Sequence, residues 1–99
     1  MLISEIISQR RVISLTSVSS KKRLFQEIAN NLALGSDLTV ESIFNALQDR
    51  EQLGPTGMGN GIAIPHAKIG GIKNIHGLFI RLEKPLEFES IDGKKVDLI

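Results

Sequence analysis

The most informative stretch of the chain, residues 50–68, reads REQLGPTGMGNGIAIPHAK. It is rich in glycine, because four glycines fall within eight residues: Gly54, Gly57, Gly59 and Gly61. Glycine permits positive φ and lets a ligand approach the main chain closely, and successive N–H groups in such turns form nests that bind anions. The stretch follows a predicted helix and enters a predicted strand, the reverse of the order in a dinucleotide-binding fingerprint. We therefore expect an anion-binding loop between a helix and a sheet.

The glycine loop leads into a short apolar strand at residues 62–64, which ends at Pro65 and His66. Proline fixes its own φ and favours extended geometry in the residue before it, so a stiff backbone presents His66 at the tip of the strand. A neutral imidazole is nucleophilic near neutral pH, and an arriving phosphoryl group needs donors directed at its three oxygens. His66 is therefore a candidate phosphoryl acceptor, and the candidate phosphate-binding residues are Arg50, Thr56, Gly57, Gly59 and Gly61.

The same residues also admit a plainer explanation. His66 would then be a turn residue, and the glycines would simply interrupt regular structure. Arg50 would complement the dipole at the C-terminus of its helix. His76 alternates with apolar residues at the start of a predicted strand, so we expect a structural or surface role for it. On spacing alone, both interpretations of His66 stay open.

Two amphipathic helices precede the loop. The first is predicted over residues 21–33, with a serine cap, an end near Gly35 and one apolar face formed by Leu24, Phe25, Ile28, Ala29 and Leu32. Its basic start, residues 21–23, is interpreted as a solvated helix end or as a docking surface for an acidic partner. The second helix is predicted over residues 40–50 with Thr39 as N-cap and a stripe of Val40, Ile43, Phe44 and Leu47. A further short helix is predicted near residues 2–7.

Strands dominate the rest of the chain. Residues 12–15 are rich in β-branched side chains, and residues 75–83 alternate, with His76, Leu78, Ile80 and Leu82 on one face. Lys84 and Pro85 are expected to interrupt this strand, and Asp92-Gly93 predicts a hairpin turn before a last strand that begins at Val96. Helices and strands without regular alternation predict an α+β domain, with a mixed β-sheet flanked by helices. All 99 residues are assigned to one domain.

Composition excludes several classes of protein. The chain has 12 Lys and Arg against 11 Asp and Glu, no Cys, two His and four aromatic residues, all Phe. This balance argues against nucleic-acid binding through bulk charge, and the lack of Cys excludes a disulfide scaffold. Two histidines are too few for an ordinary zinc site, so we expect no metal and no cofactor. The chain has neither a signal-peptide pattern nor an apolar run long enough to span a membrane, so a cytoplasmic location is expected.

The motif R-E-x-L-G-x-T-G-x-G-x-G-I-A-I-P-H resembles the phosphohistidine motif of enzyme IIA domains of the bacterial phosphotransferase system. The resemblance is to the fructose–mannitol branch, and within it to the nitrogen-regulatory type. It extends from SKKRLFQEIA to GLFIRLEKPLEFESIDGKKVDLI and so covers nearly the whole chain. The resemblance implies that His66 is the phosphorylated histidine, that Arg50 lies near it, and that Thr56 and Gly57 belong to the loop beside it.

The same resemblance implies a function and partners. A phosphorylated histidine carrier protein would donate the phosphoryl group, which the domain would pass to a transporter IIB domain or present to a regulatory target. The alternatives are a component of sugar transport, a non-catalytic regulatory protein-binding module, and a fragment without activity of its own.

This sequence departs from the family pattern at several positions. Pro55 stands where the family commonly has Ser, and Ala67 stands where it often has Gly. Family domains are also longer, so the chain is expected to be truncated at its C-terminus and to lack a second histidine near the active one. With its sheet uncovered on the face of Leu78, Ile80 and Leu82, such a chain is expected to self-associate.

Overall fold

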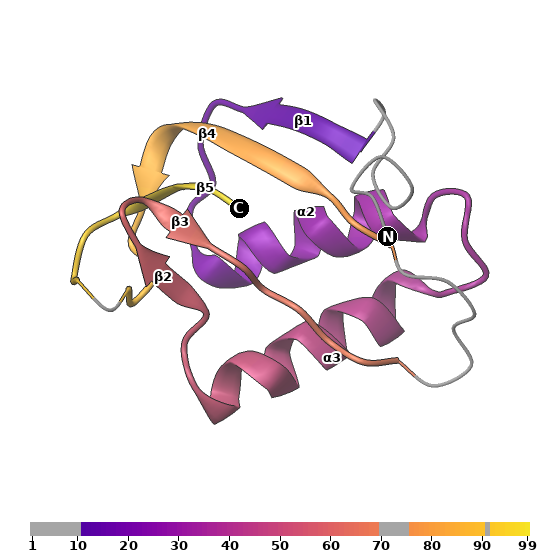
Figure 1. Cartoon of the computed structure of the whole chain (residues 1–99). Helices are drawn as coiled ribbons and strands as arrows, with labels where there is room; N and C mark the ends of the chain where they lie inside the picture. Colours follow the sequence, from indigo (N-terminus) through magenta and orange to yellow (C-terminus); the bar gives the residue numbers. More distant parts are fainter. Residues whose placement is uncertain (1–10, 70–75, 91) are drawn as a thin grey trace.

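The fold has two layers, a five-stranded sheet and a pair of helices that cover one face of it (Figure 1). The computed structural model describes residues 11–69, 76–90 and 92–99; the helix predicted near residues 2–7 lies outside this range. The elements are β1 (Val12–Leu15), α2 (Lys21–Ala33), α3 (Val40–Leu53), β2 (Gly57–Gly59), β3 (Ile62–Ala63), β4 (Phe79–Leu86) and β5 (Val96–Leu98).

The sheet is mixed, with strand order β1-β4-β5-β3-β2. β1 runs parallel to β4 and β3 runs parallel to β5, whereas the β4–β5 and β2–β3 pairs are antiparallel. The predicted α+β class, a mixed sheet flanked by helices, is confirmed.

Both helices begin where their caps predict. The Ser20 hydroxyl accepts the Arg23 N–H at 3.1 Å, and the Thr39 hydroxyl accepts the Ser42 N–H at 3.1 Å. α3 ends at Leu53, three residues beyond the predicted end at Arg50. The extra turn forms because the residues after Arg50 are good helix formers, and the helix ends only at Gly54.

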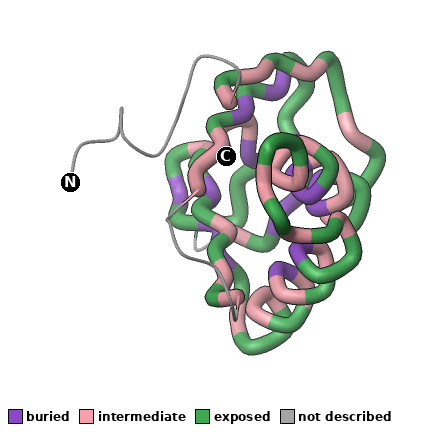
Figure 2. Tube along the Cα trace, turned by 90° about the vertical axis from the view of Figure 1, so that its right-hand side faces the viewer, coloured by how far each residue is buried: buried purple, intermediate pink, exposed green. Residues whose placement is uncertain are grey.

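The core lies between the helices and the facing side of the sheet (Figure 2). The predicted helix faces supply most of the helical part, although Leu32, Val40 and Phe44 are only partly buried. Phe25 of α2 and Phe88, just after β4, meet edge to face with ring centroids 6.1 Å apart. The buried apolar residues are Leu24, Phe25, Ile28, Ala29, Ile43, Leu47, Ala63, Ile80, Leu82, Leu86, Phe88 and Val96.

β4 differs from its prediction, because it runs through Lys84 and Pro85 to Leu86. The Lys84 N–H still donates to the Thr16 carbonyl at 3.0 Å, just beyond the end of β1. Pro85 therefore follows the Lys84 bond to the segment after β1. On its other side, toward β5, the pairing is irregular between Arg81 and Leu86, and Pro85 lies within that irregular part. A proline that has no ladder bond to donate is tolerated in a strand.

The uncovered face of the sheet is also not the predicted one. Ile80 and Leu82 are 0% and 2% exposed because the helices cover them, and Leu78 is half-buried. Alternation along β4 instead places Phe79 and Arg81 on the outer face, where Phe79 is 40% exposed. Phe79 pairs in register with Val12, so the outer face carries apolar side chains from two adjacent strands.

Asp92-Gly93 forms a turn, in which the Gly93 N–H donates to the Ser90 carbonyl at 3.0 Å. The connection between β4 and β5 spans residues 87–95, however, so this turn is part of a longer loop and not a tight two-residue hairpin. The tight hairpin of the sheet is β2–β3.

Candidate functional site

His66 follows β3 and is exposed to solvent. Its Nδ1 lies 3.0 Å from the carbonyl oxygen of Ile64, two residues earlier. A carbonyl oxygen is only an acceptor, so this hydrogen bond places the ring proton on Nδ1. In the neutral imidazole, Nε2 then carries the lone pair. The side chain thus presents a nucleophilic nitrogen in a defined tautomer.

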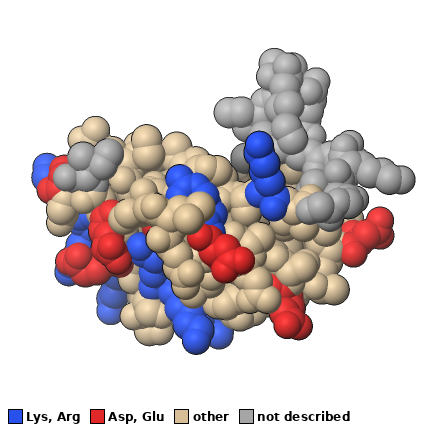
Figure 3. Space-filling model, turned by 90° about the horizontal axis from the view of Figure 1, so that it is seen from below, with Lys and Arg blue, Asp and Glu red and all other residues tan. Residues whose placement is uncertain are grey.

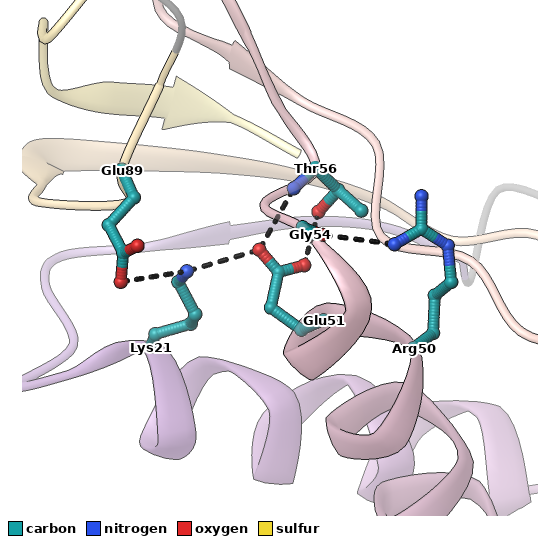
Figure 4. Close-up of polar contacts among 6 residues, drawn as sticks. All are labelled: Lys21, Arg50, Glu51, Gly54, Thr56 and Glu89. Carbon is teal, nitrogen blue, oxygen red and sulfur yellow. Dashed lines mark hydrogen bonds and ion pairs between the residues drawn. The ribbon is translucent and has the colours of Figure 1, made fainter.

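Arg50 lies in the last turn of α3, and its Nη1 donates to the Gly54 carbonyl at 2.9 Å (Figure 4). This bond satisfies a carbonyl at the end of the helix, where a cation also complements the dipole. Among the described residues, the Arg50 guanidinium has no second hydrogen-bond partner. The remaining guanidinium N–H groups are therefore available to an anion.

Thr56 is buried, with 3% exposure, and both of its donors are directed at Glu51. Its N–H donates to Oε1 at 2.9 Å and its hydroxyl donates to Oε2 at 2.7 Å (Figure 4). The sequence predicts that the Thr56 hydroxyl donates to a phosphate, whereas in the structure it donates to the Glu51 carboxylate.

Lys21 also contacts the Glu51 carboxylate. Its ammonium lies 3.0 Å from Glu51 Oε1, 3.6 Å from Glu89 Oε1 and 4.5 Å from the centre of the Phe88 ring. The prediction of a solvated basic helix start is therefore wrong for Lys21, because its ammonium pairs with carboxylates of the same chain. The side chains of Lys21, Glu51, Thr56 and Glu89 are called the Glu51 cluster below.

Gly57 is a point of close approach between β2 and the loop after β4. A Cβ atom there would lie 2.6 Å from Ser90 Oγ, 2.8 Å from Ser90 Cα and 3.2 Å from the Glu89 carbonyl oxygen. Gly57 and Ser90 also form an isolated bridge. Two of these contacts are with backbone atoms, so glycine is required here for space.

Gly59 and Gly61 flank the closed end of the β2–β3 hairpin, with φ of 94° and 79°. Asn60 between them has φ of 57°, so the turn needs residues that tolerate the left-handed region. Thr56 and Ile64 lie at the opposite, open end, joined by a bond from the Ile64 N–H to the Thr56 carbonyl at 3.0 Å. The hairpin therefore separates Gly59 and Gly61 from the segment that carries His66, and their part in phosphate binding stays a prediction.

The hairpin tip is tied to the β4–β5 loop by a carboxylate. Asp92 accepts the Asn60 N–H at 2.9 Å and the Lys94 N–H at 3.0 Å. The Asn60 bond, then the Lys94 bond, hold the pKa of Asp92 below its ordinary value of 3.8. The Asn60 N–H of the glycine turn thus already donates to a carboxylate of the same chain, that of Asp92.

We expect acid to loosen this tie. Because the folded-state pKa of Asp92 is lowered, its stabilising contribution is present above about pH 4 and is lost as the pH falls through the folded-state pKa. The protection factors of the Asn60 and Lys94 amides, with intrinsic exchange at each pH divided out, should fall between about pH 5 and pH 2. Asp92→Asn should remove this acid-dependent part, and identical pH profiles in the two proteins would contradict the assignment.

A surface pocket of about 350 Å³ lies beside the Glu51 cluster. It is lined by Lys21, Gln48, Glu51, Gln52, Gly54, Pro55 and Glu89. His66 is not among the lining residues, so the structure does not join the histidine and this pocket in one cavity.

The structure describes the charged and metal-binding side chains of residues 11–69, 76–90 and 92–99. Within these ranges, no group of three or more His, Asp or Glu side chains is placed to hold a metal ion. No helix there has the length and apolar character to cross a membrane. Seen from below, basic and acidic side chains lie interspersed (Figure 3).

Residues 5–99 match the family model described as the EIIA 2 domain of the phosphoenolpyruvate-dependent sugar phosphotransferase system. The nitrogen regulatory protein of Bradyrhizobium diazoefficiens is 39% identical over 99 residues, which are all of this chain and 65% of that protein. The 2-O-alpha-mannosyl-D-glycerate-specific EIIABC component of Escherichia coli is 34% identical over 83 residues, 82% of this chain and 13% of that protein.

A solved structure supports the same relationship. The crystal structure of nitrogen regulatory protein IIA-Ntr from Neisseria meningitidis superposes with a TM-score of 0.94 at 43% identity, covering all of this chain and 68% of that one. The chain thus spans about two thirds of the length of these nitrogen regulatory relatives. The family match over nearly every residue, with the agreement in fold, places this chain in the EIIA 2 family of the phosphoenolpyruvate-dependent phosphotransferase system.

Proposed function

We propose that this chain carries the phosphoryl-accepting part of a phosphocarrier of the nitrogen-regulatory type, with His66 as the acceptor. The observation that carries the proposal is the hydrogen bond between His66 Nδ1 and the Ile64 carbonyl at 3.0 Å, on an exposed side chain. In the neutral ring this bond leaves the lone pair on Nε2, and the exposed side chain is open to a partner protein. Family membership supports the reaction class.

The proposed step is a transfer between two histidines. The Nε2 lone pair of His66 attacks the phosphorus of a phosphorylated histidine carrier protein, in line with the departing nitrogen. A new N–P bond forms, the donor N–P bond breaks, and its electron pair returns to the donor imidazole. The proton on Nδ1 stays in place during this step, because Nδ1–H donates its hydrogen bond to the Ile64 carbonyl throughout. Arg50 would stabilise charge on the transferring oxygens.

The regulatory type is favoured over sugar transport by the extent of similarity. The nitrogen regulatory relatives align over essentially the whole chain, whereas the sugar-specific relative aligns over 82% of it at lower identity. Partners of this chain would be the phosphorylated histidine carrier protein and a regulatory target, in the cytoplasm. The second candidate function, a sugar-transport component that donates to a transporter IIB domain, is supported by the sugar-specific relative.

Intact-mass analysis after incubation with the phosphorylated carrier tests the proposal. We expect the mass of one acid-labile phosphoryl group on the native chain and on His76→Ala, and none on His66→Ala. Label that persists in His66→Ala and disappears in His76→Ala would overturn the assignment. Phosphorylation followed by transfer to a transporter IIB domain would favour the sugar-transport candidate.

We also expect the 99-residue chain to self-associate through the outer face of its sheet. That face carries Val12 at 53% exposure and Phe79 at 40%, next to the opposite charges of Arg81 and Glu83 on the same strand. An apolar patch beside alternating charges is self-complementary across a twofold axis. Sedimentation velocity should show concentration-dependent association that Phe79→Glu abolishes. Leu53→Glu, which alters an 86% exposed leucine on α3, is the control and should leave association unchanged.

A further inference from the structure

Glu51 has a nearly buried carboxylate, and both of its oxygens accept hydrogen bonds. The side chain is 7% exposed. It accepts the N–H and the hydroxyl of Thr56 at 2.9 and 2.7 Å and the ammonium of Lys21 at 3.0 Å. A buried charge is tolerated only when its lone pairs are occupied in this way. The carboxylate therefore fixes both the backbone and the side chain of Thr56.

Thr56 in turn fixes the strand that leads to His66. Its carbonyl accepts the Ile64 N–H at 3.0 Å, and the adjacent pair Gly57 and Ala63 is in register in the β2–β3 ladder. The Ile64 carbonyl then meets Nδ1 of His66 at 3.0 Å. Pro65 stands between these two residues and restricts the backbone there.

Hydrogen bonds joined by the main chain of Thr56 and Ile64 thus link Lys21 through Glu51 to His66. We propose that Glu51 is a positioning residue, which sets the ring orientation and tautomer of His66 through Thr56 and the Ile64 carbonyl. This inference rests on the proposed function, since it assigns the Glu51 cluster to the acceptor histidine. It also gives Thr56 a different role from that of a phosphate donor, because its hydroxyl proton is directed at Glu51.

The test measures the tautomer and the transfer rate separately. The ¹⁵N chemical shifts of the His66 ring, recorded where the imidazole is neutral, distinguish Nδ1–H from Nε2–H. The initial rate of phosphorylation by the phosphorylated histidine carrier protein gives the second readout. The variants are Glu51→Gln, which cannot accept from both Thr56 donors and Lys21 at once, and Thr56→Val, which removes the hydroxyl at nearly constant volume.

We expect the native chain to hold His66 mainly as the Nδ1–H tautomer. Both variants should move the population toward Nε2–H and slow transfer on the order of tenfold to a hundredfold, as misplacement of a reacting group does. Thr56→Ser keeps the hydroxyl and should restore both readouts. Glu27→Gln is the matched control, because it removes a carboxylate from the exposed Arg23 pair on α2 and should change neither.

An unchanged tautomer in folded Thr56→Val or Glu51→Gln would overturn the inference. If Glu51→Gln fails to fold, Thr56→Val decides the matter, since it leaves the Glu51–Lys21 pair intact. The two proposals fail differently. A tautomer that responds to the variants in a chain that takes no phosphoryl group would refute the proposed function and support the positioning role.

Discussion

Replacing Gly57 with alanine is expected to lower the free energy of unfolding by about 2–3 kcal/mol and the Tm by roughly 10–20 °C. The added Cβ would lie 2.8 Å from Ser90 Cα and 3.2 Å from the Glu89 carbonyl oxygen, so a shift of side chains alone cannot relieve the clash. β2 would have to move away from the loop after β4, and Thr56 would move with it. Thermal unfolding followed by circular dichroism gives the measurement.

Gly54→Ala is the matched control for this change. Gly54 has no atom within 4 Å of an added Cβ, and its φ of 165° is extended backbone that any residue adopts. We expect this variant to unfold within about 0.5 kcal/mol of the native chain, as ordinary surface substitutions do. Equal destabilisation by the two substitutions would show that the close approach at Gly57 is not the cause.

Arg50→Ala is expected to slow phosphorylation of His66 by roughly ten- to over a hundredfold. A hydrogen bond to a charged group is worth about 1.5–3 kcal/mol, which converts to that range when the bond forms only in the transition state. The folded state should lose only about 0.3–1 kcal/mol, the usual value of a cation at a helix C-terminus. Initial rates with the phosphorylated carrier, compared with unfolding curves, separate the two effects.

Arg50→Lys distinguishes a general charge effect from a directional one. Lysine keeps the positive charge but loses the planar fork of the guanidinium. We expect it to preserve the stability of α3 while recovering part of the lost rate. If Arg50→Ala kept the native rate, Arg50 would have only a structural role, through its bond to the Gly54 carbonyl.

The helices could be predicted from sequence because their signals are local. Ser20 and Thr39 are caps that act within three residues, and each is followed by an apolar face of helical period. The end of α3 was less predictable, since Arg50 is as suitable inside a helix as at its end. Pro85 suggested a break in β4, but whether its missing N–H matters depends on where the neighbouring strand ends.

The Glu51 cluster was missed because its members come from separate parts of the chain. Lys21 and Glu51 are 30 residues apart, and no local pattern joins them. A signal was nevertheless present. Lys21 stands at the start of one helix and Glu51 near the end of another, and each charge is unfavourable with its own helix dipole. Two such misplaced charges of opposite sign suggest a tertiary ion pair.

The glycine-rich loop shows the limit of composition as evidence. The spacing of its glycines predicts one anion nest, yet the glycines serve different needs. Gly57 provides space beside Ser90, and Gly61 supports the left-handed turn at Asn60. The position of His66 after a proline-stiffened strand follows from the sequence, whereas the bond between Nδ1 and the Ile64 carbonyl depends on the folded backbone and the ring rotamer.

The strand order has a consequence for how the chain folds. β5 follows the other described strands in sequence, but it lies between β4 and β3 and joins the β1–β4 pair to the β2–β3 hairpin. The helices and the hairpin rest on local contacts and can form early, whereas the β1–β4 and β3–β5 pairs close long loops, an entropic cost that slows folding. During synthesis the β3–β5 and β4–β5 ladders therefore cannot form until Val96–Leu98 has emerged, whereas β4 can pack on the helices before then.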